Sequence, residues 1–428
     1  MTDTKPSKHI VITTFGSFGD LHPYMAIALE LRSRGYRVTI ATSGVYKDKI
    51  ESEGIDFHAV RPHMFESDFM PDIMKKVMDV RTGPEYVIRN VVLPHLRGSY
   101  EDLEPILDQA DLVVTHTLTF GAHLYAEKRG LPWVSTVLQP VSLFSAIDPP
   151  IFSSAPFLSQ LRWLGPGLYK AVYKEMRRVV GKWMEPVAEL RREIGLPDTD
   201  RNAFMDGQFS PQLNLALFSP VFAAPQADWP PSTETTGFPF YDRRAKVEGM
   251  PTELDAFLEA GQPPIVFTLG SSAIFDAGTF YEDSVKAVVD LGRRAVLLIG
   301  VDANLPKEAL PPGVIACRYA PHSELFPRAA AIVHQGGIGT TAQALRSGKP
   351  MLVVPWGQDQ PDNAARIMRL GVGRSIPRAR YEASTAKSEL SKLLSDGGDA
   401  YRAKEIGKKI AAENGASAAA DRIVALLG

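Results

Sequence analysis

One segment, Ala331 to Leu345, constrains the fold of this chain more than any other. It opens with the apolar run Ala331 to Val333, which is typical of a buried strand, and it passes through three glycines into a helical pattern. Glycine lets backbone N–H groups approach an anion, and a helix N-terminus adds partial positive charge. The combination predicts a phosphate cradle, in which His334 at the strand end could donate to a phosphate oxygen. The candidate phosphate-binding residues are His334, Gly336, Gly337, Gly339 and Thr340.

A second apolar run, Met351 to Pro355, predicts another strand, and it leads to a carboxylate and an amide side by side. These are Asp359 and Gln360. Such a pair can hold adjacent hydroxyls of a sugar, because the carboxylate accepts and the amide donates hydrogen bonds. A diphosphate cradle followed by a hydroxyl clamp predicts a site for a nucleotide sugar.

These segments resemble the nucleotide-sugar signature of glycosyltransferase family 1. The likeness is carried by Tyr319–Leu325, His334–Thr341 and the pair Asp359–Gln360, while Gly16–Pro23 resembles the N-terminal acceptor loop of that family. Within the family the chain looks closest to bacterial rhamnosyltransferases of the rhamnolipid type. The stretches that support this closer likeness are Ala224–Pro230, Thr236–Pro239 and Gly336–Gly339.

The resemblance implies the GT-B architecture, an α/β fold of two Rossmann-like domains whose parallel sheets face each other across a cleft. It also implies inversion at the anomeric carbon without a metal, because the cradle stabilises the leaving diphosphate. The nucleotide sugar is then a co-substrate, and no cofactor is expected. The expected reaction moves a sugar from a UDP-glucose or dTDP-rhamnose type of donor to a hydroxyl of a lipophilic or phenolic small molecule.

The chain alternates strands and helices from its start. The sequence predicts strands at His9–Thr14 and Tyr36–Thr42 with a helix at Tyr24–Arg34 between them, a βαβ unit that requires a parallel sheet. A proline-rich break at Ala223–Pro231 precedes a second alternation that begins near Ile265. A chain of 428 residues is expected to form two domains. We predict an acceptor-binding domain at 1–235, a nucleotide-sugar-binding domain at 236–412, and a C-terminal helix at 413–428 that packs back on the first domain.

Two segments of the first domain, 61–96 and 140–181, interrupt the regular pattern with methionines and aromatic residues. Such adaptable side chains at strand-to-helix connections predict a plastic apolar pocket for a hydrophobic or lipid-like acceptor. The alternative is that they belong to ordinary core helices laid over the sheet. The residues on which the pocket prediction depends are Met64, Phe65, Phe69, Met70, Met74, Met78, Phe152, Phe157 and Trp163.

The resemblance assigns further donor-site candidates. Ser271 and Ser272 follow a predicted strand, and they could bind a phosphate or belong only to a turn. Tyr319 stands where the family usually carries a tryptophan stacked on the nucleobase, and His322 stands where a base-contacting glutamine often stands. Gln343 falls near the ribose-binding acid of the family, with one extra residue in the glycine turn of this chain.

The reaction needs a base that takes the proton of the acceptor hydroxyl. The resembling family commonly has a histidine in the first loop, oriented by an aspartate from the strand around 111–116. Here the first position is Asp20 and the second region ends in His116, so the two residue types are exchanged. Asp20 can take the proton directly, His116 can take it while Asp20 holds the ring, or Asp20 is only a helix cap. His22 is a third candidate for the base.

Composition narrows the class and the location. Lys plus Arg is 47 and Asp plus Glu is 49, a net charge of −2, so no basic excess points to nucleic acid. The single cysteine, Cys317, fits a reducing compartment, and the polar N-terminus lacks the apolar region of a signal peptide. No apolar run approaches the roughly 20 residues of a membrane span. These features predict a cytoplasmic enzyme and leave room for transient contact with a membrane surface.

Other classes can share strand–glycine–helix units. An NAD-dependent oxidoreductase needs G-x-G-x-x-G after the first strand and an acid after the second. Gly16 and Gly19 do not form that pattern, and the second strand ends at Ile40–Ser43 without an acid. A nucleotide-sugar epimerase or phosphorylase and a non-catalytic nucleotide-sugar-binding subunit remain the alternatives on the same fold.

Overall fold

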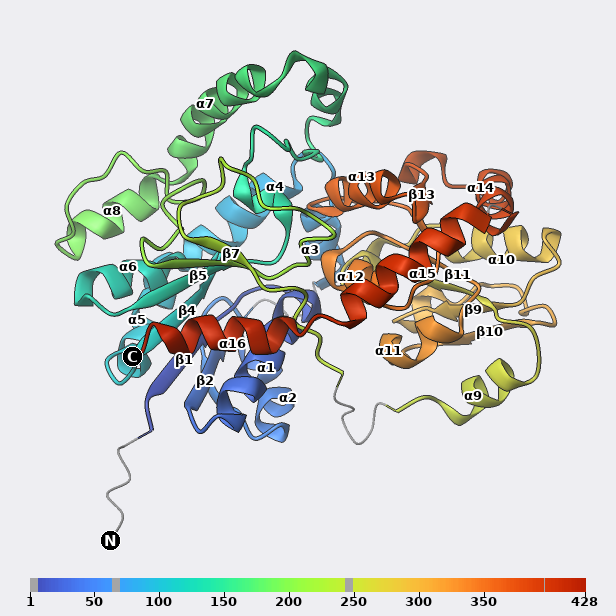
Figure 1. The fold of residues 1–428 in the computed structure, drawn as a ribbon, viewed down its shortest axis with the longest axis horizontal. Coiled ribbons are helices and arrows are strands. Elements are labelled where there is room, and N and C mark those ends of the chain that lie inside the picture. Colours follow the sequence, from blue (N-terminus) through green and yellow to red (C-terminus); the bar gives the residue numbers. More distant parts are fainter. Residues whose placement is uncertain (1–6, 64–69, 243–248, 396) are drawn as a thin grey trace, which may run out of the picture.

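The computed structural model describes residues 7–63, 70–242, 249–395 and 397–428. It contains two α/β units that lie side by side, each built around one sheet with helices packed against it (Figure 1). Adjacent strands within each sheet run parallel. The predicted architecture of two Rossmann-like domains with parallel sheets is confirmed.

The sheet of the first unit has the strand order β3-β2-β1-β4-β5-β6-β7. In its interior, Ile10 of β1 lies opposite Val38 of β2 on one side and Leu112 of β4 on the other. All five residues of β1 are buried, as expected for a strand that helices cover on both faces. The strands are β1 (His9–Thr13), β2 (Arg37–Thr42), β3 (Asp56–Ala59), β4 (Leu112–His116), β5 (Trp133–Val137), β6 (Leu213–Ala216) and β7 (Thr233–Thr235).

The first helix begins earlier than the sequence pattern predicts. Ser17 is its N-cap, and the Ser17 backbone N–H donates to Asp20 Oδ2 at 2.8 Å, so these residues form a capping box. Asp20, which the sequence offers as the helix cap, is instead the third residue of the helix, and the cap itself is Ser17. The helices of the first unit are α1 (Phe18–Ser33), α2 (Lys47–Ser52), α3 (Met70–Val77), α4 (Gly83–Tyr86), α5 (Leu96–Leu107), α6 (Phe120–Arg129), α7 (Pro166–Trp183) and α8 (Glu185–Glu193).

The second unit repeats the arrangement with the strand order β10-β9-β8-β11-β12-β13. β11 lies between β8 and β12, with Val333 opposite Phe267 and Leu352. The strands are β8 (Ile265–Thr268), β9 (Ala295–Leu298), β10 (Val314–Cys317), β11 (Ala331–His334), β12 (Met351–Val353) and β13 (Gly373–Ser375). The helices are α9 (Thr252–Glu259), α10 (Phe280–Asp290), α11 (His322–Leu325), α12 (Ile338–Arg346), α13 (Gln360–Leu370), α14 (Ala383–Ser395) and α15 (Gly397–Ala411).

The last helix, α16 (Gly415–Ala425), returns to the first unit and lies next to α1 (Figure 1). Ala420 and Ile423 share an apolar core with Ile27 of α1, and Arg34 donates to Asp421 at 2.5 Å. The division into 1–235, 236–412 and 413–428 stays a prediction. Among the described residues, none of the helices has the length and apolar content needed to cross a bilayer.

Candidate active site

A cavity of about 940 Å³ lies between the two units and is lined by both of them. Its walls come from the loops that follow β1, β4 and β5 in the first sheet and β8, β11 and β12 in the second. Ligands of parallel α/β sheets bind beyond the carboxyl ends of the strands, and here the carboxyl ends of two sheets face the same space. We call this space the interdomain cavity.

The glycine turn after β11 forms one wall of the interdomain cavity. Gly336 has a φ of +92°, a left-handed conformation that favours glycine. Gly337 is the N-cap of α12, and it lines the cavity together with Gly339 and Thr340. A Cβ added at Gly339 would come 3.7 Å from the Cα of Gly19, so the turn lies against the start of α1 in the other unit. The N-terminus of α12 therefore borders the cavity, as an anion site on a helix requires.

His334 is placed differently from the sequence expectation. Its side chain is fully buried and does not line the interdomain cavity. Its Nδ1 accepts from the Gly336 backbone N–H at 3.0 Å, its Nε2 lies 3.5 Å from the sulfur of Met351, and burial lowers its pKa to about 3. In this structure the His334 side chain supports the turn from inside, and its contact with a phosphate stays a prediction. Successive side chains of a strand point to opposite sides, so the following residue faces the cavity instead.

That residue is Gln335, which the sequence analysis missed. It lines the interdomain cavity while only 6% exposed, and its Oε1 has no hydrogen-bond partner in the described structure. Its Nε2 lies 2.9 Å from where a Cβ of Gly337 would be, and closer still to that of Gly270. Gln335 thus lies between the glycine turn after β8 and the glycine turn after β11. The sequence signal that could have identified Gln335 is its position as the first residue after the strand.

Ser271 and Ser272 also line the cavity, on the loop that follows β8. The Ser271 hydroxyl donates to Ser17 Oγ at 3.1 Å. Ser17 caps α1, so this hydrogen bond joins the loop after β8 in the second unit to the start of the helix that carries Asp20. Phosphate binding by Ser271 and Ser272 stays a prediction.

The three nucleoside candidates all line the interdomain cavity. Tyr319 is 49% exposed, which leaves an aromatic face for stacking. His322 stacks on Phe326 with ring centroids 4.3 Å apart, and burial lowers its pKa to about 4. The Gln343 amide donates to Asp242 at 3.3 Å and its oxygen accepts from Arg346 at 2.7 Å, so neighbouring side chains already bind its polar group.

Asp359 immediately precedes α13 and lines the cavity. Its Oδ2 accepts from the Asn363 amide at 2.7 Å. Burial, with a smaller contribution from the charge of Asp20, raises the pKa of Asp359 to about 7. A carboxyl group with a pKa near 7 is partly protonated at neutral pH, so it can accept a hydrogen bond from a sugar hydroxyl or donate one to it.

Gln360 follows Asp359, and the oxygen and nitrogen of its side-chain amide have different surroundings. Its Oε1 accepts from the backbone N–H groups of Trp356 at 2.7 Å and Gly357 at 3.2 Å. The side chain lines the interdomain cavity, and its Nε2 makes no hydrogen bond to another described residue. The amide is therefore left to donate to a ligand, while the oxygen holds the turn after β12.

Asp20 and His116 lie close together in the first unit, with 3.8 Å between Asp20 Oδ1 and His116 Nε2. His116 Nδ1 accepts from the Leu118 backbone N–H at 3.3 Å, so the proton of the neutral ring resides on Nε2, which faces Asp20. Burial lowers the pKa of His116 to about 4 and raises the pKa of Asp20 to about 6. The pair thus consists of a neutral imidazole and a carboxyl group that ionises near neutrality. Asp20 also belongs to the capping box at the start of α1, and its role as the base stays a prediction.

His22, the third candidate, lines the cavity between aromatic rings. Its ring centroid lies 5.3 Å from that of Phe18 and 5.0 Å from that of Tyr241. Its Nε2 is buried without a hydrogen-bond partner in the described structure, and burial, followed by the charge of Lys49, lowers its pKa to about 3. His22 is thus packed as a neutral ring.

The first unit contributes an apolar wall to the interdomain cavity. Met74, Met78 and Phe152 line it, as the sequence expectation for a plastic pocket requires. Phe157 and Trp163 do not, because they lie on the surface, 61% and 79% exposed. Met64, Phe65 and Phe69 lie outside the described residues, as does the side chain of Met70. Other apolar residues of the wall are Phe15, Val87, Ile88, Val91, Leu118, Phe144, Met176, Val180, Trp183 and Phe204.

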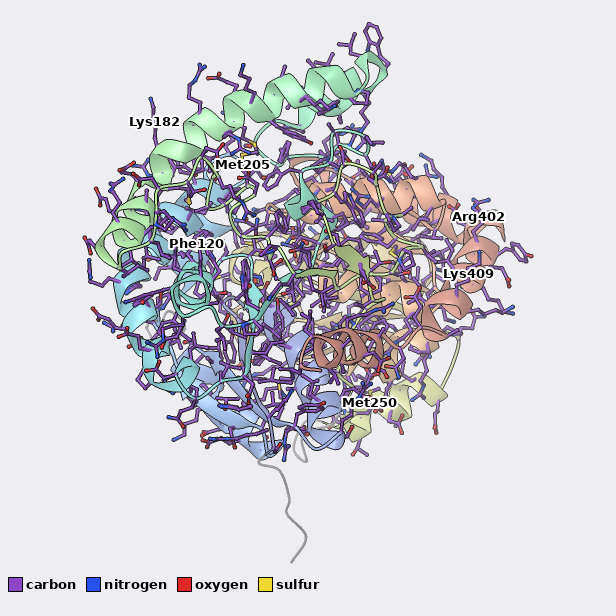
Figure 2. All side chains as sticks on the ribbon, turned by 60° about the vertical axis from the view of Figure 1, so that its left-hand side comes forward. Phe120, Lys182, Met205, Met250, Arg402 and Lys409 are labelled. Atoms are coloured by element: carbon purple, nitrogen blue, oxygen red, sulfur yellow. The ribbon has the colours of Figure 1, made fainter. Side chains whose placement is uncertain are left out.

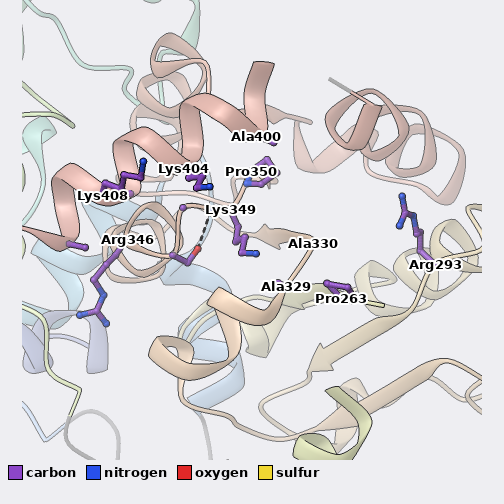
Figure 3. Close-up of a pocket in the computed structure, with 14 residues that line it drawn as sticks. Pro263, Arg293, Ala329, Ala330, Arg346, Lys349, Pro350, Ala400, Lys404 and Lys408 are labelled. Carbon is purple, nitrogen blue, oxygen red and sulfur yellow. Dashed lines mark hydrogen bonds between the residues drawn. The ribbon is translucent and has the colours of Figure 1, made fainter. Parts of the chain in front are cut away.

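A second hollow, of about 720 Å³, lies on the second unit and contains none of the predicted site residues (Figure 3). None of the residues that line it is acidic. Its basic side chains are Arg293, Arg346, Lys349, Lys404 and Lys408. Two of them are already paired, Arg346 with Asp242 at 2.6 Å and Lys408 with Glu405 at 2.7 Å.

Sequence comparisons agree with this geometry. Residues 10–93 match the N-terminal domain of glycosyltransferase family 28, and residues 283–427 match the erythromycin biosynthesis protein CIII-like C-terminal domain. The chain is 30% identical over 421 residues to O-mycaminosyltylonolide 6-deoxyallosyltransferase of Streptomyces fradiae, an alignment that covers 95% of this chain and 94% of that protein. It is 27% identical over 446 residues to a sterol 3-beta-glucosyltransferase of Leptosphaeria maculans, covering 98% of this chain and 29% of that longer protein.

Solved structures share the whole fold. The glycotransferase of kitacinnamycin superposes with a TM-score of 0.69 at 25% identity, covering 99% of this chain and 100% of that one. The glycosyltransferase VinC in complex with dTDP gives a TM-score of 0.70 at 20% identity, covering 98% and 99%. Two parallel sheets with a nucleotide-sugar site between them define the class of GT-B glycosyltransferases. This chain belongs to the glycosyltransferase family 1/28 superfamily within that class, and it is an enzyme of the natural-product and sterol glycosyltransferase type.

Proposed function

We propose that this enzyme transfers a hexosyl or deoxyhexosyl group from a nucleoside diphosphate sugar to a hydroxyl of a lipophilic small molecule, with inversion at the anomeric carbon. The observation that carries the proposal is the position of Asp20. We call the face of the interdomain cavity that the first unit forms the acceptor side, and the face that the second unit forms the donor side. Asp20 lines the acceptor side together with the apolar wall, and its charge contributes to the raised pKa of Asp359 on the donor side. A base in that position can take the proton of an acceptor hydroxyl that lies next to the sugar of the donor.

Asp20 acts as the general base in this proposal. The acceptor oxygen loses its proton to the Asp20 carboxylate and forms a bond to the anomeric carbon, while the bond from that carbon to the diphosphate oxygen breaks. His116 positions Asp20, because its Nε2–H faces Oδ1 and its Nδ1 is occupied by the Leu118 backbone. The neutral ring with that proton arrangement has no free lone pair toward the acceptor. This favours Asp20 over His116 as the base.

The donor side would bind the diphosphate and stabilise its charge as it leaves. We assign this role to the N-terminus of α12, with Gly337, Gly339 and Thr340, and to the Gln335 amide, with Ser271 and Ser272 as further donors. Asp359 and the Gln360 amide would then hold the sugar hydroxyls. No cluster of three or more His, Cys, Asp or Glu side chains in the described ranges is arranged to hold a metal ion. Metal independence is part of the proposal, and activity that persists in EDTA would support it.

The sugar and the nucleotide are proposed at the level of class. A dTDP complex of VinC and the 6-deoxyallosyltransferase name of the Streptomyces fradiae relative favour a dTDP-deoxysugar, with UDP-glucose as the alternative. The names of the relatives also favour a macrolide-like or sterol-like acceptor, which the apolar wall could hold. A rhamnolipid-type acceptor stays a narrower version of the same proposal. We place the reaction in the cytoplasm, in line with the single half-buried thiol of Cys317.

A donor and acceptor screen by mass spectrometry tests this function. The donors are dTDP-rhamnose and UDP-glucose, and the acceptors are a macrolide aglycone, a sterol, a phenol and a hydroxy-fatty acid. We expect at least one pair to give an acceptor whose mass has increased by one sugar unit. Asp20→Asn is the control, and it should give no such product. Interconversion of the donor without transfer, or no turnover of any donor, would contradict the proposal.

A further inference from the structure

The outer side of α7 carries a surface that the proposed reaction does not use. This helix runs along the upper left edge of the molecule in Figure 1 and along the top in Figure 2, where Lys182 is labelled. A short 3-10 segment, η6 (Pro156–Leu164), precedes it, with only Gly165 between. We call η6 and the exposed side of α7 together the α7 ridge.

The η6 end of the α7 ridge is apolar and exposed. Phe157, Trp163 and Leu164 expose 61%, 79% and 47% of their surfaces. None of the three lines the interdomain cavity. Exposed large apolar side chains gathered in one place usually mark a surface that contacts another apolar phase or a partner.

The α7 part of the ridge is cationic. Lys170, Lys174, Arg178 and Lys182 recur at every fourth position and are all exposed, so they follow one side of the helix. Arg178 pairs with Glu175 at 3.0 Å, whereas the three lysines have no carboxylate partner among the residues that the structure describes. The chain contains no Asp or Glu from Pro149 to Lys174. The three lysines are therefore not held in ion pairs with described carboxylates.

We propose that the α7 ridge docks on the surface of an anionic phospholipid membrane. Tryptophan and phenylalanine favour the boundary between headgroups and acyl chains, and lysines on the adjacent helix face attract acidic headgroups. Each lysine near an anionic membrane surface contributes about 1 kcal/mol to binding. Because an acidic protein surface could also meet these lysines, the test below separates the two partners.

The opposite side of α7 connects this surface to the acceptor site. Met176, Val180 and Trp183 line the interdomain cavity. Val179 also lines it while 46% exposed, so the cavity reaches the protein surface beside the ridge. A docked enzyme would therefore hold its apolar cavity next to the lipid. The acceptor is then an amphiphile that partitions into membranes. This inference about the acceptor rests on the proposed function, whereas the docking itself does not.

Vesicle flotation of the full chain tests the docking without any turnover. We expect the enzyme to float with vesicles of phosphatidylcholine and phosphatidylglycerol, more weakly with phosphatidylcholine alone, and less in high salt. Replacing Lys170, Lys174 and Lys182 with glutamine should weaken binding about fivefold per lysine. The matched control replaces Lys404, Lys408 and Lys409, three exposed lysines of α15, and should bind as the wild type does.

The aromatic end is tested separately by Trp163→Ser combined with Phe157→Ser. We expect this variant to lose binding to both kinds of vesicle, with an unchanged melting temperature because both side chains are exposed. Failure of the wild type to float, or equal losses in the α7 and α15 variants, would overturn the proposal and leave an acidic protein as the partner to seek. Since flotation needs no substrate, such a failure would be distinct from a failure of the transferase function.

Discussion

The guanidinium of Arg366 in α13 and the carboxylate of Asp148 in the first unit form an ion pair between the two units, with 2.6 Å between Nη1 and Oδ2. Arg366 also binds Asp362 at 2.8 Å, and Asp362 in turn accepts from the Ile151 backbone N–H at 3.0 Å. α13 begins directly after Asp359, the proposed sugar-binding residue. This network therefore fixes the sugar-binding end of α13 to the loop that leads to the acceptor wall.

Breaking this network should destabilise the protein. In Arg366→Ala the fully buried carboxylate of Asp362 loses its charged partner, so we expect the free energy of unfolding to fall by about 3–5 kcal/mol. Urea denaturation measures the change. Arg369→Ala is the matched control, because Arg369 contacts the same Asp148 at 3.0 Å from a side chain that is 42% exposed. That variant should lose no more than about 1 kcal/mol, and equal losses would mean that burial of the network contributes nothing.

Gln335→Ala should impair use of the donor while sparing the fold. Its Oε1 has no partner to lose, and its amide lies between the two glycine turns. Removal of one positioned donor to a developing charge typically costs about 100- to 1000-fold in turnover. Steady-state kinetics measure the loss of turnover, and a thermal melt checks that the fold is unchanged. Wild-type turnover in this variant would remove Gln335 from the phosphate site.

His334→Ala should act mainly through stability. The substitution leaves the Gly336 N–H without its acceptor and opens a cavity beside Met351, so we expect a loss of about 2–4 kcal/mol. His334→Asn is the informative companion, since its side-chain oxygen can still accept from Gly336. It should recover much of the stability and activity. A stable but inactive His334→Ala enzyme would instead support direct contact between the imidazole and phosphate.

Asp359→Asn should stabilise the protein and weaken donor binding. The pKa of Asp359 is about 7 when folded and near 4 when unfolded, so the folded state keeps a proton that the unfolded state releases between these values. Stability is therefore lost as pH rises from about 4 to about 7. Asn does not ionise, so the variant does not lose stability in this way. At pH 8 we expect its free energy of unfolding to exceed that of the wild type by on the order of 1–3 kcal/mol.

The same variant should bind the nucleotide sugar less tightly and the free nucleoside diphosphate as well as the wild type. Calorimetry with both ligands measures this difference, because only the sugar offers hydroxyls to Asp359. Equal losses for the two ligands would show that the side chain has only a structural role. A variant that is less stable than the wild type at pH 8 would contradict the assigned pKa.

Much of the fold follows from the sequence because buried parallel strands have a clear apolar signature. The runs at 9–14, 265–269 and 331–333 are short and mainly apolar, each has a glycine within the next three residues, and each forms an interior strand. The start of α1 was harder to predict from the sequence, because Ser17 lies between two glycines and Asp20 is an equally suitable cap residue. Helix starts depend on one or two hydrogen bonds, whereas strands depend on a whole apolar run.

The site was predictable as a set of loops but less so side chain by side chain. Asp20 and His116, which are far apart in the sequence, do face each other, as their exchanged residue types suggested. His334 turned inward and Gln335 outward, because alternation along the end of β11 decides which residue reaches the cavity. Phe157 and Trp163 are exposed, since composition alone does not separate a pocket from a surface that contacts another phase.

The most direct test of the account is the pH dependence of kcat/KM for sugar transfer in the wild type, Asp20→Asn and His116→Ala. A base must be deprotonated, so wild-type activity should rise as pH increases through about 6, the pKa of Asp20. Asp20→Asn can keep the capping hydrogen bond and should melt normally, yet transfer at least about 100-fold more slowly. His116→Ala should be slower than the wild type but keep a rising limb. Near wild-type transfer by Asp20→Asn, or loss of that limb in His116→Ala, would contradict Asp20 as the base.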